Sequence, residues 1–144
     1  MAILFNSCTP EWAWLSNFSP HPVGEWPTLE HAYQASRTLD PVQRHRIRFI
    51  QSPGLAKMIA STFDARPGWG IKKIMVMERA LRVKFQNPEL RQKLIDTGKE
   101  ELVHLAPWDT FWGKNKEGVG DNMLGQMLMN LRWEFINAST STEY

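Results

Sequence analysis

Apolar side chains recur every three or four residues along two stretches of the chain, and this spacing predicts two amphipathic helices. The clearer stretch runs from Gly70 to Phe85, and the other runs from about Met123 to Ile136. The apolar positions are Ile71, Ile74, Met75 or Met77, Leu81 and Phe85 in the first, and Leu124, Met127, Leu128, Leu131 and Phe135 in the second. We expect each set to form the core-facing side of its helix.

Residues with capping chemistry mark four further helices. Thr28 is a suitable N-cap, Pro41 ends that first helix and could open the next, and Ser52 stands before a proline that fits the first turn of a third. Asn87 precedes another proline, and Gly98 is a typical helix stop. The expected helices cover about residues 29–39, 41–49, 53–63 and 88–97.

The strand signals are short. Leu102, Val103 and Leu105 predict a strand within Glu101–Ala106, and the first 27 residues, rich in aromatics, Pro, Ser and Asn, predict short strands and turns. The fold class expected is α+β, a helix-dominated single domain with a few short strands. We place the domain at residues 1–136 and expect residues 137–144, which are small and polar, to form a flexible C-terminal tail.

Length and composition narrow the class of protein. A chain of 144 residues fits one core, and its longest apolar runs are too short to span a membrane. No signal-peptide pattern is present, so we expect a cytoplasmic protein. The single Cys8 excludes an internal disulfide, and the four histidines lack metal-ligand spacing. The glycines at 118–120 match neither a P-loop nor a dinucleotide fingerprint, so no cofactor is expected.

The net charge of +2 does not identify a partner. One local basic cluster contains Arg44, His45, Arg46 and Arg48. A solvated helix face is its simpler interpretation, and a phosphate-binding patch is the alternative. Binding to nucleic acid is only weakly supported, because bulk electrostatic attraction would need a larger excess of positive charge.

Two carboxylates lie among aromatic and amide side chains. Glu30 stands in the first turn of a predicted helix, with Tyr33 and Gln34 as its i+3 and i+4 neighbours. Such a carboxylate could simply complement the helix dipole, or it could act where positive charge develops. Asp109 lies between Trp108 and the segment 111–113, where it could cap its own turn or, partly desolvated by the rings, donate a proton.

The beginning of the last helix offers a third candidate. Asn122 is most simply an N-cap, and the adjoining Gly120 and Asp121 could form a ligand edge with it, because helix N-termini also bind phosphate.

Several segments together resemble the NADAR family, also called the YbiA-like family, over roughly residues 4 to 135. The matching segments lie in family order: 15–18, 26–35, Trp69 with Lys73 and Met77, 81–85, 94–98, 109–113, 120–125 and 128–132. The resemblance implies a YbiA-like α+β fold and an N-glycosidase. Some members of this family cleave phosphoribosylated riboflavin-pathway intermediates, and others remove ADP-ribose from modified guanine bases.

By position, the resemblance places Glu30, Trp69, Asp109, Trp112 and Asn122 in the pocket, and analogy with two-carboxylate sugar chemistry suggests the roles. Glu30 and Asp109 would be catalytic. Glu30 would stabilise the cationic sugar or activate water, and Asp109 would act as the acid or second base; the reverse assignment is the alternative. Trp69 and Trp112 would stack on the base, and Arg37 and Lys73 would meet phosphate. The remaining substrate-binding residues would be Asn17, Phe18, Gly113 and Asn122. The expected partner is a small N-riboside or an ADP-ribose-type ligand, and we expect no association with a membrane.

Two positions depart from the family pattern. Arg37 stands where the family commonly has a lysine, and an arginine cannot form a Schiff base with an opened ribose. Lys73 or Lys84 could supply an amine instead. His104 replaces a glutamate that relatives usually carry. Three hypotheses therefore remain: an N-glycosidase acting on a small N-riboside, a hydrolase of ADP-ribosylated guanine in nucleic acid, and a non-catalytic module that binds ADP-ribose or NAD-type ligands.

Overall fold

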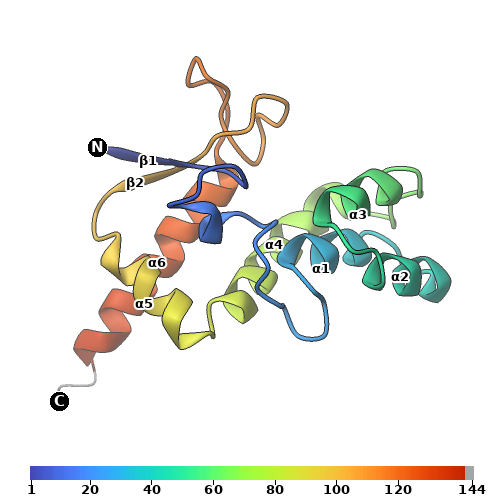
Figure 1. The fold of residues 1–144 in the computed structure, drawn as a ribbon, viewed down its shortest axis with the longest axis horizontal. Helices are drawn as coiled ribbons and strands as arrows, with labels where there is room; N and C mark the ends of the chain where they lie inside the picture. Colours follow the sequence, from blue (N-terminus) through green and yellow to red (C-terminus); the bar gives the residue numbers. More distant parts are fainter. Residues whose placement is uncertain (142–144) are drawn as a thin grey trace. The chain divides into compact units, whose positions relative to one another are not determined.

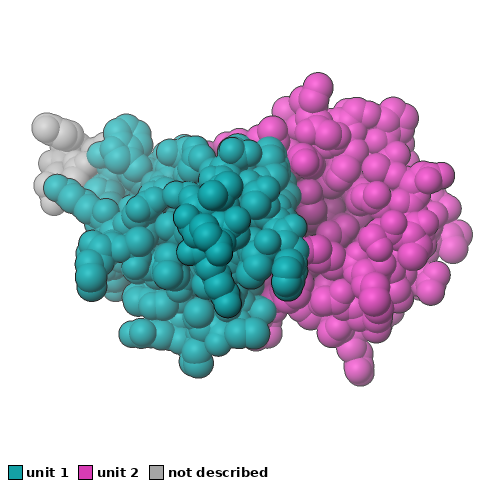
Figure 2. All heavy atoms as spheres, turned by 90° about the horizontal axis from the view of Figure 1, so that it is seen from above, with its two compact units in different colours: residues 1–16, 85–144 teal, residues 17–84 magenta. Residues whose placement is uncertain are grey.

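The computed structural model describes residues 1–141 and contains six α-helices, one short 3-10 helix and two strands within them. The expected helix-dominated α+β class is confirmed. The chain divides into two compact units, residues 1–16 with 85–144 and residues 17–84, which are coloured separately in Figure 2. We describe each unit by itself.

The unit of residues 17–84 is entirely helical apart from its loops (Figure 1). It consists of α1 (Leu29–Ser36), α2 (Pro41–Arg48), α3 (Pro53–Ala60) and α4 (Trp69–Lys84). The N-caps of α1 and α3 are Thr28 and Ser52, as predicted, and Asp40 caps α2. Small and branched side chains fill the centre of α1–α3: Ala35, Ile47, Ala56 and Ala60, with Trp26, Ile50 and Phe63 packed around them.

Two boundaries and one face in this unit differ from the expectation. α1 ends at Ser36 rather than near Leu39, because the Arg37 carbonyl accepts a hydrogen bond from the Arg66 amide, 2.8 Å away, instead of continuing the helix. α3 ends at Ala60 rather than near Phe63. α4 forms where predicted, but Ile71 is 82% exposed, while Met77 and Lys84 are each 1% exposed. The predicted core face of α4 was therefore wrong in part.

The other unit combines a two-stranded sheet with helices. Strand β1 (Ala2–Phe5) pairs in parallel with β2 (Glu101–His104), with Ala2 opposite Glu101 and Phe5 opposite His104. The helices are the 3-10 helix η1 (Ala13–Leu15), α5 (Pro88–Asp96) and α6 (Met123–Ser141).

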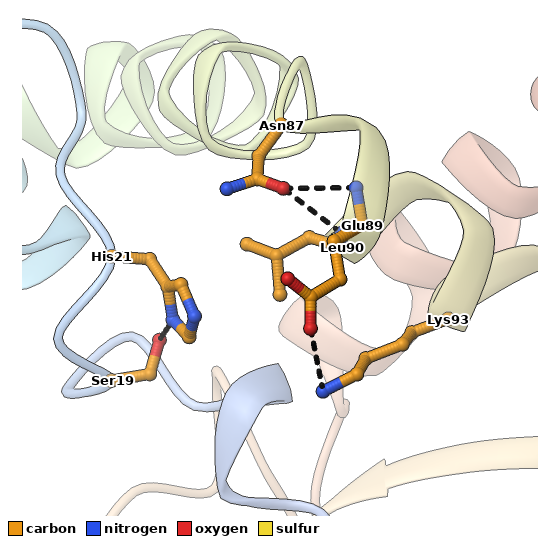
Figure 3. A network of polar contacts seen from close by, with 6 residues as sticks. All are labelled: Ser19, His21, Asn87, Glu89, Leu90 and Lys93. Atoms are coloured by element: carbon orange, nitrogen blue, oxygen red, sulfur yellow. Dashed lines mark hydrogen bonds and ion pairs between the residues drawn. The ribbon is translucent and has the colours of Figure 1, made fainter.

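A side-chain cap begins α5, and α6 runs further than expected. Asn87 accepts the amides of Glu89 and Leu90, which begins α5, and a Glu89–Lys93 ion pair follows one turn later (Figure 3). α6 continues to Ser141, five residues beyond the expected end at Ile136. The helix therefore crosses the boundary that we placed between domain and tail, and residues 142–144 of the expected tail lie outside the described part of the chain.

Candidate functional site

The first turn of α1 carries Glu30 at a buried position. Glu30 is only 5% exposed. Its Oε1 accepts a hydrogen bond of 2.8 Å from Nε2 of Gln34, one helical turn later. A buried carboxylate needs hydrogen bonds because its charge has lost water. Gln34 thus fixes the orientation of Glu30. Neither Gln34 nor Tyr33 was among the predicted site residues, although their i+4 and i+3 spacing from Glu30 would have identified them.

Hydrogen bonds of His31 anchor this turn. His31 is fully buried; its Nε2 donates to the carbonyl of Ile50 at 2.7 Å, and its Nδ1 accepts from Oγ1 of Thr28 at 2.8 Å. A carbonyl can only accept, so this geometry assigns the proton of a neutral ring to Nε2. Thr28 Oγ1 also accepts the His31 amide. His31 therefore holds the start of α1 against the segment before α3.

Asn17 joins α1 to α4. Its carbonyl accepts the Glu30 amide at 3.1 Å, and its Nδ2 donates to Sδ of Met77 at 3.6 Å. Asn17 is 8% exposed, and its buried Oδ1 has no hydrogen-bond partner among the described residues. A buried acceptor of this kind costs stability unless a ligand or water satisfies it. The following residue, Phe18, is half-buried.

Two residues expected to contact substrate share one face of α4 with the buried Met77. Trp69, Lys73 and Met77 are spaced by four residues and so share this face. The rings of Trp69 and Tyr33 lie 5.3 Å apart at 45°, which brings an aromatic pair to the α1–α4 interface. Trp69 and Lys73 are both half-buried. Glu30, Tyr33, Gln34 and Arg37 also share one face of α1, by the same rule of spacing.

Lys84 ends the buried face of α4. Its burial lowers the pKa of the amine from its ordinary 10.5 to about 7. Between these two pH values the unfolded chain holds a proton that the folded chain has released. The contribution of Lys84 to the free energy of unfolding therefore increases as the pH rises from about 7 towards 10.5.

This pH dependence can be measured. We expect the free energy of unfolding in urea to increase between about pH 7 and about pH 9, by up to about 1.4 kcal/mol per pH unit from this group. The Lys84→Met variant should lose that increase, since methionine does not titrate. Lys57→Met makes the same change at an exposed position of α3 and should keep it. Equal slopes for all three proteins would contradict the assignment.

Arg37 is used to brace α3. Its Nη1 donates to the carbonyls of Ala60 at 2.5 Å and Phe63 at 2.6 Å, at the last residue of that helix and in the turn that follows it. Contact between its other N–H groups and a phosphate stays a prediction.

The other unit contains Asp109, whose turn-capping alternative is observed. Its Oδ1 accepts the amides of Phe111 at 3.2 Å and Trp112 at 2.9 Å. Trp112 is 8% exposed, and its ring meets Phe111 edge-on at 4.8 Å. At Gly113 any Cβ would overlap with the carbonyl oxygen of His104, so only glycine fits there. A catalytic role of Asp109 stays a prediction.

Asn122 is bonded to β2. Its Oδ1 accepts the His104 amide and its Nδ2 donates to the Leu102 carbonyl, both at 2.9 Å. It lies at φ 51°, in the left-handed region that asparagine tolerates. These bonds give Asn122 a structural role, and its binding of substrate stays a prediction.

Three amides at the start of α6 are already hydrogen-bonded. The amides of Asn122, Met123 and Leu124 donate to the carbonyls of Gly113, Phe111 and Trp112. Three N–H groups that a phosphate could use are therefore already paired, and the ligand edge that we expected from Gly120, Asp121 and Asn122 stays a prediction.

Comparisons with known proteins identify the family. The NADAR domain profile matches residues 4–136. This chain belongs to the NADAR family. The N-glycosidase YbiA of Escherichia coli is 38% identical over 137 residues, which cover 90% of this chain and 86% of that protein. The N-glycosidase Npun_R5314 of Nostoc punctiforme is 33% identical, covering 99% and 97%.

The fold agrees with the family. The NMR structure of E. coli YbiA matches this NADAR chain with a TM-score of 0.86 at 36% identity, over 100% of this chain and 89% of that one. A maize protein, the chloroplastic riboflavin biosynthesis protein PYRR, is 38% identical over 84% of this chain, which is 23% of its own length. The expectation of an N-glycosyl hydrolase family is thus confirmed.

Residues 1–141 show neither a cluster of metal ligands nor a helix suited to cross a membrane. Within that range, no group of three or more His, Cys, Asp or Glu side chains is placed to hold a metal ion. The helices there lack the combination of length and apolar character that crossing a bilayer requires.

Proposed function

We propose that this chain hydrolyses the N-glycosidic bond of a ribosylated base, a phosphoribosyl intermediate of the riboflavin pathway or a related N-riboside. The observation that carries the proposal is the buried carboxylate of Glu30, oriented by Gln34 at the start of α1. The names of the relatives, N-glycosidase and riboflavin biosynthesis protein, support the reaction class and the kind of substrate.

The reaction requires stabilisation of a cationic sugar. As the C–N bond breaks, its electron pair leaves with the base nitrogen, and positive charge develops at C1 and the ring oxygen. Water then adds to C1, and one of its protons is transferred to the base. An ionised carboxylate beside C1 stabilises the cation or accepts the proton of the water. We assign this role to Glu30.

The neighbouring side chains suit the rest of such a substrate. The Tyr33–Trp69 ring pair offers an aromatic surface for a flat base. Lys73 follows Trp69 by one turn of α4 and supplies a positive charge for the phosphate. Asn17 Oδ1, buried without a partner among the described residues, can accept a hydrogen bond from a ribose hydroxyl or a base amine.

A variant tests the role of acid or second base that we predict for Asp109. Asp109→Asn keeps an Oδ1 for the amides of Phe111 and Trp112 but cannot donate an acidic proton. We expect kcat to fall about a hundredfold, with the midpoint of thermal unfolding nearly unchanged. Asp121→Asn, at an exposed position, is the matched control and should retain activity. Undiminished kcat in Asp109→Asn would remove this role.

A non-catalytic module for ADP-ribose-like ligands is the second candidate, and Arg37 favours it. An arginine that braces α3 cannot supply the amine that a lysine would. Mass spectrometry after incubation with phosphoribosyl aminopyrimidines, ADP-ribosylated guanine DNA and NAD separates the candidates. Release of a free base from the aminopyrimidine supports our proposal; release only from the modified DNA favours the guanine hydrolase; binding of ADP-ribose without any cleavage favours the module.

A further inference from the structure

A hollow of about 450 Å³ lies in the helical unit, and none of the residues proposed above for the N-glycosidase lines it. Cavities of roughly 300–1,000 Å³ are the ordinary size for small-molecule sites. Its lining comes from the loop before α1 and from α2 with the segment preceding it. It includes Glu25, Trp26, Leu39, Arg44, His45 and Arg48.

The aromatic wall of the hollow is fixed in place. Trp26 exchanges two backbone hydrogen bonds of 3.0 Å with Val23, which close a tight turn around Gly24 at φ 60°. The indole packs on the buried cluster formed by α1, α2 and α3, while part of its surface stays exposed. Such a rigid, amphipathic ring is a good contact surface because little conformational entropy is lost when a ligand binds to it.

Arg44 is oriented beside this ring. Its guanidinium carbon lies 5.4 Å from the centroid of the Trp26 ring, and its Nη1 donates to the Ala35 carbonyl at 2.8 Å. A guanidinium has five N–H donors in a planar fork, so these contacts orient the group and leave donors for a ligand. The positive charge is therefore preorganised rather than free to move with a long surface side chain.

A second guanidinium follows one turn later on the same face. Arg48 pairs with Glu25 at 3.3 Å, and the two side chains are 40% and 63% exposed. Exposed ion pairs of this kind contribute at most about 1 kcal/mol, so a stronger anion can replace the carboxylate. His45 adds an imidazole to the lining, and its ring centroid lies 4.8 Å from that of Phe49, with the two rings tilted at 55°. Two like charges at i and i+4 repel each other unless an anion lies between them.

We infer that the hollow binds a nucleoside monophosphate. Its phosphate, with a charge near −2 and three acceptor oxygens, bridges Arg44 and Arg48 and displaces Glu25. Its base lies against Trp26 and Leu39, the apolar part of the lining. This site is independent of the proposed hydrolysis, since the two use different residues.

The test is isothermal titration of the whole chain with AMP, ribose 5-phosphate and adenosine, each repeated with three variants. Arg48→Gln should weaken AMP binding at least about tenfold, because it removes a charge-assisted contact. Glu25→Gln should tighten it by about threefold, because the competing carboxylate is lost. Arg46→Gln removes the same charge from an exposed position of α2 that does not line the hollow and should change affinity less than about twofold.

The three ligands and the controls decide the outcome. AMP should bind more tightly than ribose 5-phosphate, and adenosine should bind least. Equal affinity for AMP and ribose 5-phosphate would overturn the part of the inference that concerns the base. Equal losses in Arg46→Gln and Arg48→Gln, or tighter binding of a single-stranded oligonucleotide that depends on both arginines, would overturn the site in favour of a diffuse basic surface. Glu30→Gln should bind AMP normally, which separates this result from failure of the proposed hydrolysis.

Discussion

Glu30→Gln is expected to reduce turnover of a cleaved N-riboside by about a thousandfold while leaving the fold intact. Glutamine has the same shape, and its Oε1 can still accept the hydrogen bond from Gln34. The variant removes the negative charge that the cationic sugar requires, and little else. Single-turnover kinetics followed by mass spectrometry of the released base measure the effect, and circular dichroism checks the fold.

The matched control for this variant is Glu78→Gln. Glu78 lies on α4 in the same unit, 52% exposed and paired only at the surface with Arg82 at 3.3 Å. Its loss should leave turnover within about twofold of the unmodified chain, as expected for an exposed pair. If Glu30→Gln retained more than about a tenth of the original kcat, the buried carboxylate would not be the group that stabilises the transition state.

Gly125→Ala is expected to destabilise the fold by about 3–5 kcal/mol. Gly125 lies in the first turn of α6 where the helix crosses β2. A Cβ at this position would overlap with the Leu102 carbonyl oxygen and with both side-chain polar atoms of Asn122. The helix must therefore move away from the strand, and the two hydrogen bonds of Asn122 to β2 would be strained. Chemical denaturation followed by fluorescence measures the loss.

A second glycine in a helix shows what the same substitution does without a clash. Gly70 lies in α4, and a Cβ there would meet nothing within 4 Å. Gly70→Ala should leave stability unchanged or raise it by up to about 1 kcal/mol, because alanine restricts the unfolded chain and favours helix. A similar loss in both variants would show that the close contact of α6 with β2 is not what makes Gly125 necessary.

Capping chemistry predicted helix positions well because it acts over three or four residues. Thr28, Ser52 and Asn87 begin helices as expected, each accepting backbone amides of its own first turn. The face of α4 was harder to predict. Its buried side includes Lys84 and half-buried Lys73, while Ile71 is exposed, so hydrophobic periodicity pointed partly to the wrong residues. Buried lysines disturb that signal, because a periodicity of apolar residues counts them as solvent-facing positions.

The roles of the candidate site residues depended on contacts between distant parts of the chain. Glu30 became a candidate through local signals, its helix position and its sequence neighbours. Arg37 braces carbonyls 23 and 26 residues away, and Asn122 bonds to a strand 18 to 20 residues earlier. Both were expected to contact substrate, since a sequence motif records which residue is needed and not which group it contacts. The same limit applied to Arg44, whose partners Trp26 and Ala35 come from earlier segments.

The side chain of Asn122 also protects a sheet that has only two strands. β1 occupies one edge of β2, and the Leu105 amide continues that pairing to the Phe5 carbonyl. On the opposite edge the primary amide of Asn122 takes the place of a peptide group in a third strand, and Lys114 bonds to His104 and Ala106 just beyond it. From the Leu102 carbonyl to the Ala106 amide, that edge of β2 has no open position for a strand from another molecule, and so gives edge-to-edge aggregation no template there.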